Sequence, residues 1–129
     1  MIFVLDTSAY SEFNRGDIRL RKWFLKDNEI IVPLIVVGEL RAGFALGSKR
    51  KDNEVLLQKF LDSPNVDIVT ITNTTTTLFA KIYSKLRQRC KPIGTNDMWI
   101  AAIALEHDSV LLTLDDDFDY VPDLKLANI

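Results

Sequence analysis

The sequence contains a single cysteine, Cys90, and a single histidine, His107. One cysteine cannot form an internal disulfide, which argues against a small secreted protein held by disulfides and favours the cytoplasm. The chain also lacks any cluster of histidine and cysteine ligands, and no histidine lies near Cys90 in sequence. A soft-ligand metal site and a catalytic thiol are therefore both disfavoured.

Long apolar runs are missing as well. No run approaches the roughly 20 residues that a membrane span needs, and no basic segment precedes Ile2–Leu5 as it would in a signal peptide. Four prolines and five glycines, with 47% hydrophobic residues, exclude a disordered or fibrous chain. A length of 129 residues suits one ordinary core, so residues 1–129 are expected to form a single domain.

Charge of one sign is absent from two long segments. Residues 68–96 hold no acid and residues 92–124 hold no lysine or arginine, although the net charge is only −2. The cations of the first segment are Lys81, Lys85, Arg87, Arg89 and Lys91. This separation fits metal chemistry beside a polyanion-binding face. It fits equally well an ordinary solvated helix face followed by an acidic loop.

Apolar segments typical of strands alternate with amphipathic ones typical of helices. Strands are expected at Ile2–Leu5, Glu29–Val32, Val66–Ile71 and Val110–Leu114, with a short edge strand at Leu124–Ala127. Helices are expected at Ser8–Phe13, from Asp17, at 33–46, at Lys51–Leu61 with Val55, Leu56 and Phe60 inward, at Thr74–Arg89, and from a Thr95 or Asn96 cap to Glu106. This alternation predicts an α/β fold with a mainly parallel sheet and helices on both faces.

Two of the apolar strands run directly into an acid. Asp6 ends the first strand, before Thr7 and Ser8, and Asp115 follows the strand that contains Leu111 and Leu112. Parallel strands share one carboxyl edge, where open α/β sheets bind their ligands, so the two carboxylates are expected to emerge together. The alternative is that Asp6 or Thr7 merely caps the following helix.

Two further acids lie on expected helices. Glu39 sits in the apolar run Leu34–Leu40, with no lysine or arginine three or four positions away. Such a carboxylate either meets a cation or tilts to the solvated rim of its helix. Asp97 opens the helix after Gly94, where it either joins the same edge or simply complements the helix dipole.

Several carboxylates on one edge cannot all ionise without a compensating cation. Oxygen-only ligands favour a hard ion, Mg²⁺ or Mn²⁺. Such ions typically serve phosphoryl chemistry, in which they bind phosphate oxygens and position an attacking water. Among the further acids of the 115–119 run, Asp116 and Asp119 are expected to be solvated surface.

Four sequence blocks resemble the signatures of PIN-domain ribonucleases, and more narrowly of VapC-type toxins. They are DTS at 6–8, GEL at 38–40, GTNDMWIAAIAL at 94–105 and LLTLDDDF at 111–118, joined by RAGFALGSKRKDN at 41–53. The resemblance covers essentially the whole chain. It implies a three-layer α/β/α sandwich with a five-stranded, mainly parallel sheet, and Mg²⁺- or Mn²⁺-dependent endonuclease action on RNA.

The resemblance also implies roles for individual residues. The catalytic acids of the family match Asp6, Glu39, Asp97 and Asp115. The metal ligands implied are Asp6, Asp97, Asp115 and, ranked second, Asp117, with Glu39 a direct or water-mediated ligand. Polar positions that line the site match Thr7, Ser8 and Thr113. The family further implies a homodimer and a small VapB-like antitoxin as partner.

The RNA backbone is expected to be held by Arg41 and by the cationic stretch Lys81–Lys91, which includes Lys85 and Arg87. Three other readings compete with an RNA-cleaving toxin. A phosphoacceptor signalling domain is rejected, because the first strand ends in one acid and not in an acidic pair. An RNA-processing nuclease without an antitoxin stays open. So does a non-catalytic binding module, although none of the four acids is missing.

Overall fold

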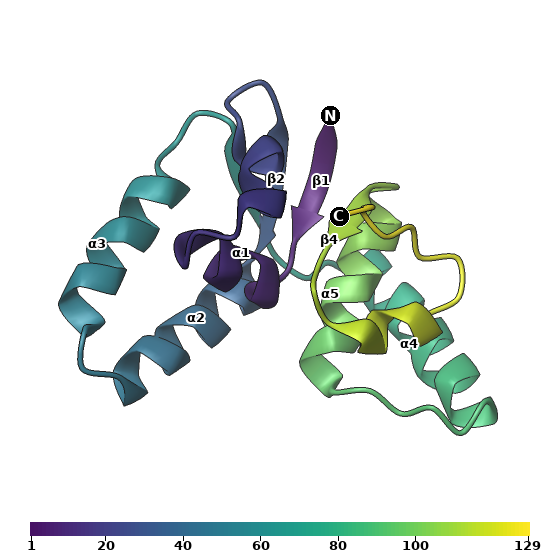
Figure 1. Ribbon diagram of the computed structural model, residues 1–129. Helices are drawn as coiled ribbons and strands as arrows, with labels where there is room; N and C mark the ends of the chain where they lie inside the picture. The colour runs from purple at the N-terminus through teal and green to yellow at the C-terminus, as the bar shows by residue number, and fades with distance from the viewer.

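The computed structural model describes all residues, 1–129. Its strands are separated along the chain by one or more helices (Figure 1). The strands are β1 (Ile2–Leu5), β2 (Glu29–Pro33), β3 (Val66–Val69) and β4 (Val110–Leu112). The α-helices are α1 (Thr7–Asn14), α2 (Leu34–Leu46), α3 (Arg50–Leu61), α4 (Asn73–Gln88) and α5 (Thr95–Glu106). Two 3₁₀ helices complete the chain, η1 (Ile18–Phe24) and η2 (Asp116–Tyr120).

The sheet has the order β3-β2-β1-β4, and all three of its pairings are parallel. β1 is central, and its Phe3, Val4 and Leu5 are fully buried, as a strand covered on both faces requires. Because all strands point the same way, the residues that follow β1 and β4 meet at one edge. The expected α/β class with a parallel sheet is confirmed.

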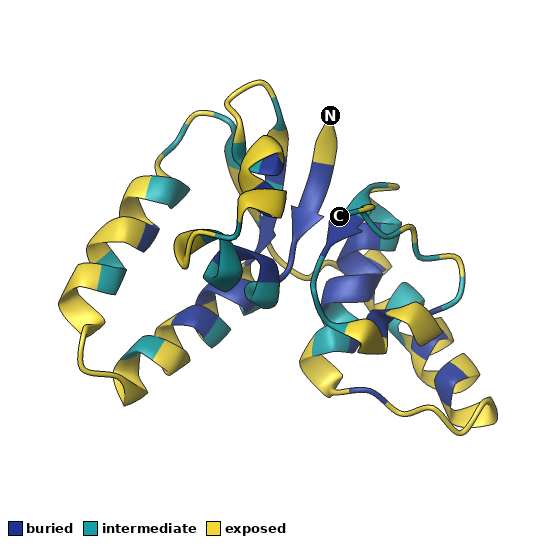
Figure 2. Cartoon of the chain, in the orientation of Figure 1, coloured by how far each residue is buried: buried dark blue, intermediate teal, exposed yellow.

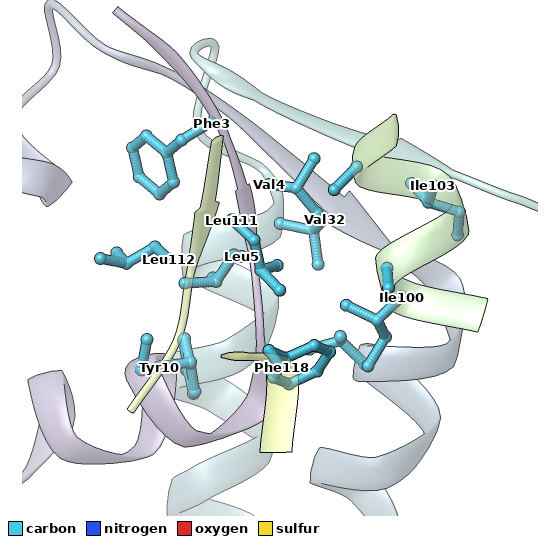
Figure 3. Packing of buried hydrophobic residues seen from close by; sticks show 14 of the residues in the cluster. Phe3, Val4, Leu5, Tyr10, Val32, Ile100, Ile103, Leu111, Leu112 and Phe118 are labelled. Atoms are coloured by element: carbon cyan, nitrogen blue, oxygen red, sulfur yellow. The ribbon is translucent and has the colours of Figure 1, made fainter. Parts of the chain in front are cut away.

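Helices cover the sheet from two sides. On one face, Phe3 packs against the rings of Trp23 and Phe24, at centroid distances of 5.5 and 6.4 Å. On the other face, Val4 points toward α5, which carries Ile100 and Ile103 (Figure 3). α4 packs along α5, and α2 and α3 form a second pair (Figure 1), of which α2 also contacts α5.

The sheet contains four strands, so the expected fifth strand is wrong. Residues near the C-terminus make only an isolated parallel bridge, Leu126 to Leu111. Within β4 only Leu111 bonds to this segment: its N–H donates to the Lys125 carbonyl, and its carbonyl accepts the Ala127 N–H. β4 is shorter than expected, since it ends at Leu112 and not at Leu114. The Leu114 N–H is hydrogen-bonded to the Ser8 hydroxyl at 3.0 Å and does not continue the ladder with β1. β3 is also shorter than expected and ends at Val69.

The expected inward face of the helix at 51–61 is partly wrong. Val55 and Leu56 are 68% and 53% exposed, whereas Leu57 is fully buried and Phe60 is half-buried. The buried stripe of α3 therefore passes through Leu57 and Phe60, and the sequence pattern was phased incorrectly. Figure 2 shows how much of α2 and α3 is exposed compared with α5.

The start of α5 differs by one residue from the expected start. Its N-cap is Gly94, and neither Thr95 nor Asn96 caps the helix. The Met98 N–H donates to the Gly94 carbonyl at 3.1 Å, which begins the helical ladder there. Asp97 consequently lies in the first turn of α5.

No helix in the structure combines the length and the apolar character needed to cross a membrane.

Candidate active site

Asp6 leaves the sheet at the carboxyl end of β1 and is only 3% exposed. It occupies the N-cap position of α1, yet its side chain makes no capping hydrogen bond. Instead its Oδ2 accepts hydrogen bonds from the hydroxyls of Thr113, at 2.6 Å, and Ser8, at 2.9 Å. The cap alternative for the Asp6 side chain is therefore excluded, and the carboxylate is directed to the strand edge.

The same two hydroxyls also bind the backbone that follows β4. Ser8 Oγ accepts the Leu114 N–H at 3.0 Å, and Thr113 Oγ1 accepts the Asp115 N–H at 3.0 Å. Each hydroxyl donates its proton to the Asp6 carboxylate and accepts a backbone proton from residues 114–115. Ser8 and Thr113 thus fasten the exit of β1 to the exit of β4, and they orient Asp6 relative to Asp115.

Burial raises the pKa of Asp6 above its ordinary value, while the hydrogen bonds from Thr113 and Ser8 act in the opposite direction. The nearby negative charge of Glu39 adds to the upward shift. A buried carboxylate costs free energy to ionise, and donated hydrogen bonds recover part of that cost. The two hydroxyls therefore favour the charged form of Asp6.

Glu39 reaches the site from α2, where it is half-buried. Its Oε1 accepts a hydrogen bond from the Thr7 hydroxyl at 2.7 Å, which connects α2 to the first residue of α1. No lysine or arginine forms an ion pair with Glu39. Glu39 is thus not fully exposed at the solvated edge of α2, and no positive side chain neutralises its charge.

Three carboxylates converge most closely. One oxygen from each of Asp97, Asp115 and Asp117 lies within 4.8 Å of the other two. Asp115 caps η2, since its Oδ1 accepts the Asp117 N–H at 2.9 Å. That short helix turns Asp117 back toward Asp97, so Asp117 is a closer member of the cluster than its second rank in the sequence suggests.

The pKa of Asp97 is raised to about 6. Burial is the largest cause, followed by the negative charges of Asp6, Asp115, Glu39 and Asp117 in that order. None of these acids is neutralised by an ion pair with a lysine or arginine of the chain. Four carboxylates therefore act on Asp97 at this edge, and no ion-paired lysine or arginine compensates for them.

The donor set fits a divalent cation. All the groups are hard carboxylate oxygens, the kind that Mg²⁺ and Mn²⁺ prefer. Burial raises the pKa of Asp97 most, and the neighbouring negative charges raise it further; a cation bound between the carboxylates would relieve that repulsion. Asp116 and Asp119 are exposed and stand outside the cluster, as expected from the sequence.

The cations expected to hold substrate are engaged elsewhere in the chain. Arg41 is paired with Glu54 at 3.1 Å, and Lys85 lies 3.8 Å from Asp123. The Arg87 guanidinium lies 5.2 Å from the centre of the Tyr83 ring. The cationic and acidic segments of the sequence partly neutralise each other in the fold, because Lys85 at the end of α4 lies beside Asp123 in the acidic segment after η2. A role for these three residues in substrate binding stays a prediction.

The sequence did not reveal that Ser8 and Thr113 also bind the backbone that follows β4. Both were expected to line the site, but their bonds to the backbone at 114–115 were not foreseen. The available signal was a threonine that interrupts the apolar run from Val110 to Leu114. A hydroxyl at such a position needs a polar partner when it is not exposed.

Comparison with known proteins gives consistent results. The family model for the PIN domain matches residues 3–124. The ribonuclease VapC2 of Rickettsia felis is 29% identical over 99% of this chain and 98% of its own length. The ribonuclease VapC4 of Mycobacterium tuberculosis is 30% identical over 76% of this chain and 75% of its own. Among solved structures, VapBC2 of Rickettsia felis, bound to a promoter DNA fragment, superimposes with a TM-score of 0.84 at 28% identity, covering 99% and 98% of the two chains.

Proposed function

The chain belongs to the PIN domain family, and within it to the VapC ribonucleases, and from this membership we propose that it is a metal-dependent endoribonuclease. Its reaction is hydrolysis of RNA phosphodiester bonds. The observation that carries the proposal is the set of carboxylates at the carboxyl edge of β1 and β4, which lacks any ion-paired lysine or arginine. A module that only binds RNA would not be expected to place these carboxylates at the site, because they repel the phosphate backbone.

Asp97, Asp115 and Asp117, with Asp6 beside them, would hold the divalent cation, Mg²⁺ or Mn²⁺. The bound ion would neutralise these carboxylates and supply Lewis-acid activation of the phosphodiester and of water. Glu39 contributes a further negative charge from α2, either as a ligand or through a water. These ligand assignments follow from the convergence of one oxygen from each of three acids and from the pKa of Asp97.

The residues around the ligands orient them. Ser8 and Thr113 both donate to Oδ2 of Asp6 and so fix the orientation of the carboxylate that would contact the cation. The Thr7 hydroxyl fixes one oxygen of Glu39 in the same way. Preorganised carboxylates of this kind avoid reorganisation when the charge of the reacting phosphate develops.

The partner proposed is a small VapB-like antitoxin. The similar structure from Rickettsia felis is of VapBC2 bound to a DNA fragment from its promoter. An antitoxin explains how a cell tolerates an RNA-cleaving enzyme. We further propose a homodimer, and a cytoplasmic location where RNA substrate is available. A small open reading frame directly upstream supports the toxin assignment, and its absence favours an RNA-processing nuclease.

The test is cleavage of structured RNAs by the purified chain in Mg²⁺ or Mn²⁺, with EDTA and with the variants Asp6→Asn and Asp97→Asn. Asp119→Asn is the matched control, because Asp119 is an exposed acid of η2 outside the cluster. We expect cleavage by the wild type and the control alone, and none in EDTA. Cleavage that survives both active-site substitutions, or that persists in EDTA, contradicts the proposal.

A further inference from the structure

A groove of about 610 Å³ runs between α1, α2 and α3. Thr7 and Glu39, two residues of the candidate active site, line it, and so do Phe44, Lys49 and Asn53. α2 advances about 1.5 Å per residue, so Phe44 lies about 7 Å beyond Glu39 along the helix. The groove is therefore continuous with the acidic site and leads away from it on the α2–α3 side of the sheet.

Phe44 differs from the other half-exposed phenylalanines. Each of the others packs against a further aromatic ring, as Phe13 does on Phe24 and Phe79 does on Trp99. Phe44 has no aromatic partner; part of its ring is anchored on the hydrophobic core and part is accessible. A fixed aromatic surface with a free side is what an unpaired base needs for stacking.

Two polar groups of the groove have no partner in the chain. The Asn53 side chain is half-buried and makes no hydrogen bond, although an amide offers two donors and one acceptor. The Lys49 ammonium forms no ion pair, whereas the other cation of the groove, Arg15, is paired with Glu12. Lys49 is thus an available point charge for a phosphate on this side of the acidic site.

We propose that this groove holds a single-stranded segment of the RNA substrate next to the scissile bond, with a base stacked on Phe44 and a phosphate held by Lys49. The inference rests on the proposed function for its substrate class. Asn53 then hydrogen-bonds a base edge or the ribose. RNA fits the groove better than an apolar peptide helix does, because a nucleotide offers a phosphate for the ammonium, a flat base for the aromatic face and polar edges for the amide.

The experiment measures binding without cleavage. A fluorescein-labelled 12-nucleotide single-stranded RNA of mixed sequence is titrated with the purified chain in EDTA, by fluorescence anisotropy, at several salt concentrations. The variants are Lys49→Ala and Phe44→Leu, the latter chosen to retain apolar contact with the core. Lys26→Ala is the matched control, because Lys26 is an exposed lysine without an ion pair that precedes β2 at the opposite edge of the sheet.

Loss of one phosphate contact in Lys49→Ala should weaken binding about 3- to 10-fold and lower the slope of log Kd against log salt by about 0.7. Loss of a stacked base in Phe44→Leu should weaken binding about 5- to 100-fold with little change in the salt slope. Lys26→Ala should bind like the wild type. Circular dichroism melts of all three variants establish that each is folded.

The proposal is overturned if both groove variants bind RNA like the wild type, or if Lys26→Ala weakens binding as much as Lys49→Ala. It is also overturned if the groove variants lose only the binding of an acidic peptide, which would assign the groove to a protein partner. Failure of the proposed function is a separate result: no RNA is cleaved in Mn²⁺, while the binding experiment still decides the groove.

Discussion

The crowding of acids around Asp97 predicts an unusual pH dependence of stability in the metal-free protein. The pKa of Asp97 is raised to about 6 in the folded chain, compared with an ordinary value of 3.8. A group whose pKa is higher in the folded state binds its proton more tightly there. Its stabilising contribution is therefore complete below pH 3.8 and is lost as the pH rises through 6. Asp6, whose pKa is also raised, acts in the same direction.

The size of the effect follows from the pKa difference. At about 1.4 kcal/mol for each pH unit, the interval from 3.8 to about 6 corresponds to about 3 kcal/mol. Solvent reaches part of the Asp97 carboxylate and screens its neighbours, which reduces the expected value to roughly 1–2 kcal/mol. For a domain of this size, that corresponds to roughly 3–8 °C in melting temperature.

The assay compares wild type and Asp97→Asn by thermal unfolding in EDTA at pH 4.5 and pH 7.5. The asparagine keeps the shape of the side chain and removes the charge. We expect the two proteins to melt alike at pH 4.5, and Asp97→Asn to melt higher than the wild type at pH 7.5. Mn²⁺ at 100 times its Kd should stabilise the wild type by about 2.7 kcal/mol and so raise its melting temperature at pH 7.5. The melting temperature of Asp97→Asn should rise much less.

The opposite sign would refute the reasoning. If Asp97 mainly complements the dipole of α5, a carboxylate in the first turn stabilises the helix, and Asp97→Asn lowers the melting temperature at pH 7.5. Asp119→Asn serves as the control for removing one negative charge from the molecule as a whole. A rise in Asp119→Asn equal to that in Asp97→Asn would show a net-charge effect and not a local one.

Three further predictions concern single side chains. Thr113→Val removes one hydrogen bond to Asp6 and leaves the Asp115 N–H without an acceptor. Urea unfolding should show a loss of about 1–3 kcal/mol in the free energy of unfolding, largely recovered in Thr113→Ser. Equal stability of the valine variant and the wild type would contradict the hydroxyl link. Glu39→Gln keeps an acceptor for its hydrogen bond but removes a charge, so it should weaken Mn²⁺ binding in calorimetry without lowering the melting temperature. Leu57→Ala should cost about 2–5 kcal/mol in urea unfolding and Val55→Ala less than about 0.5 kcal/mol, and the reverse order would contradict the observed face of α3.

The parts of the fold that the sequence predicted well are those set by local pattern. The unbroken apolar run of β1 predicted a central, doubly covered strand, and β1 has the predicted bounds. The alternation of segments predicted the parallel sheet, and the resemblance to VapC-type PIN proteins is confirmed by the comparisons. The wrong end of the strand at Val110–Leu114 depends on a tertiary contact. The end of β4 is decided by Ser8, a residue more than 100 positions away in the chain, and no local pattern contains that information.

The candidate site shows the same division. The positions of Asp6 and Asp115 followed from the rule that parallel strands end at one edge. Asp117 lies close to Asp97 and Asp115 because η2 turns the chain there. A run of aspartates in the sequence does not predict that turn. The pairing of Lys85 with an acid after η2 was likewise invisible in the sequence, where both segments looked free to bind other molecules.

Two acids of the candidate site, Asp6 and Asp97, have different surroundings. Asp6 is buried and bonded to two hydroxyls, each of which is itself fixed by a backbone N–H, so its position does not depend on any ion. Asp97 accepts no hydrogen bond from another side chain and is held among like charges. The first arrangement fixes geometry, and the second stores repulsion that a bound cation relieves. A carboxylate edge that served stability alone would not gather four other acids around Asp97, so this crowding indicates an edge suited to binding a cation, at a cost to the stability of the metal-free chain.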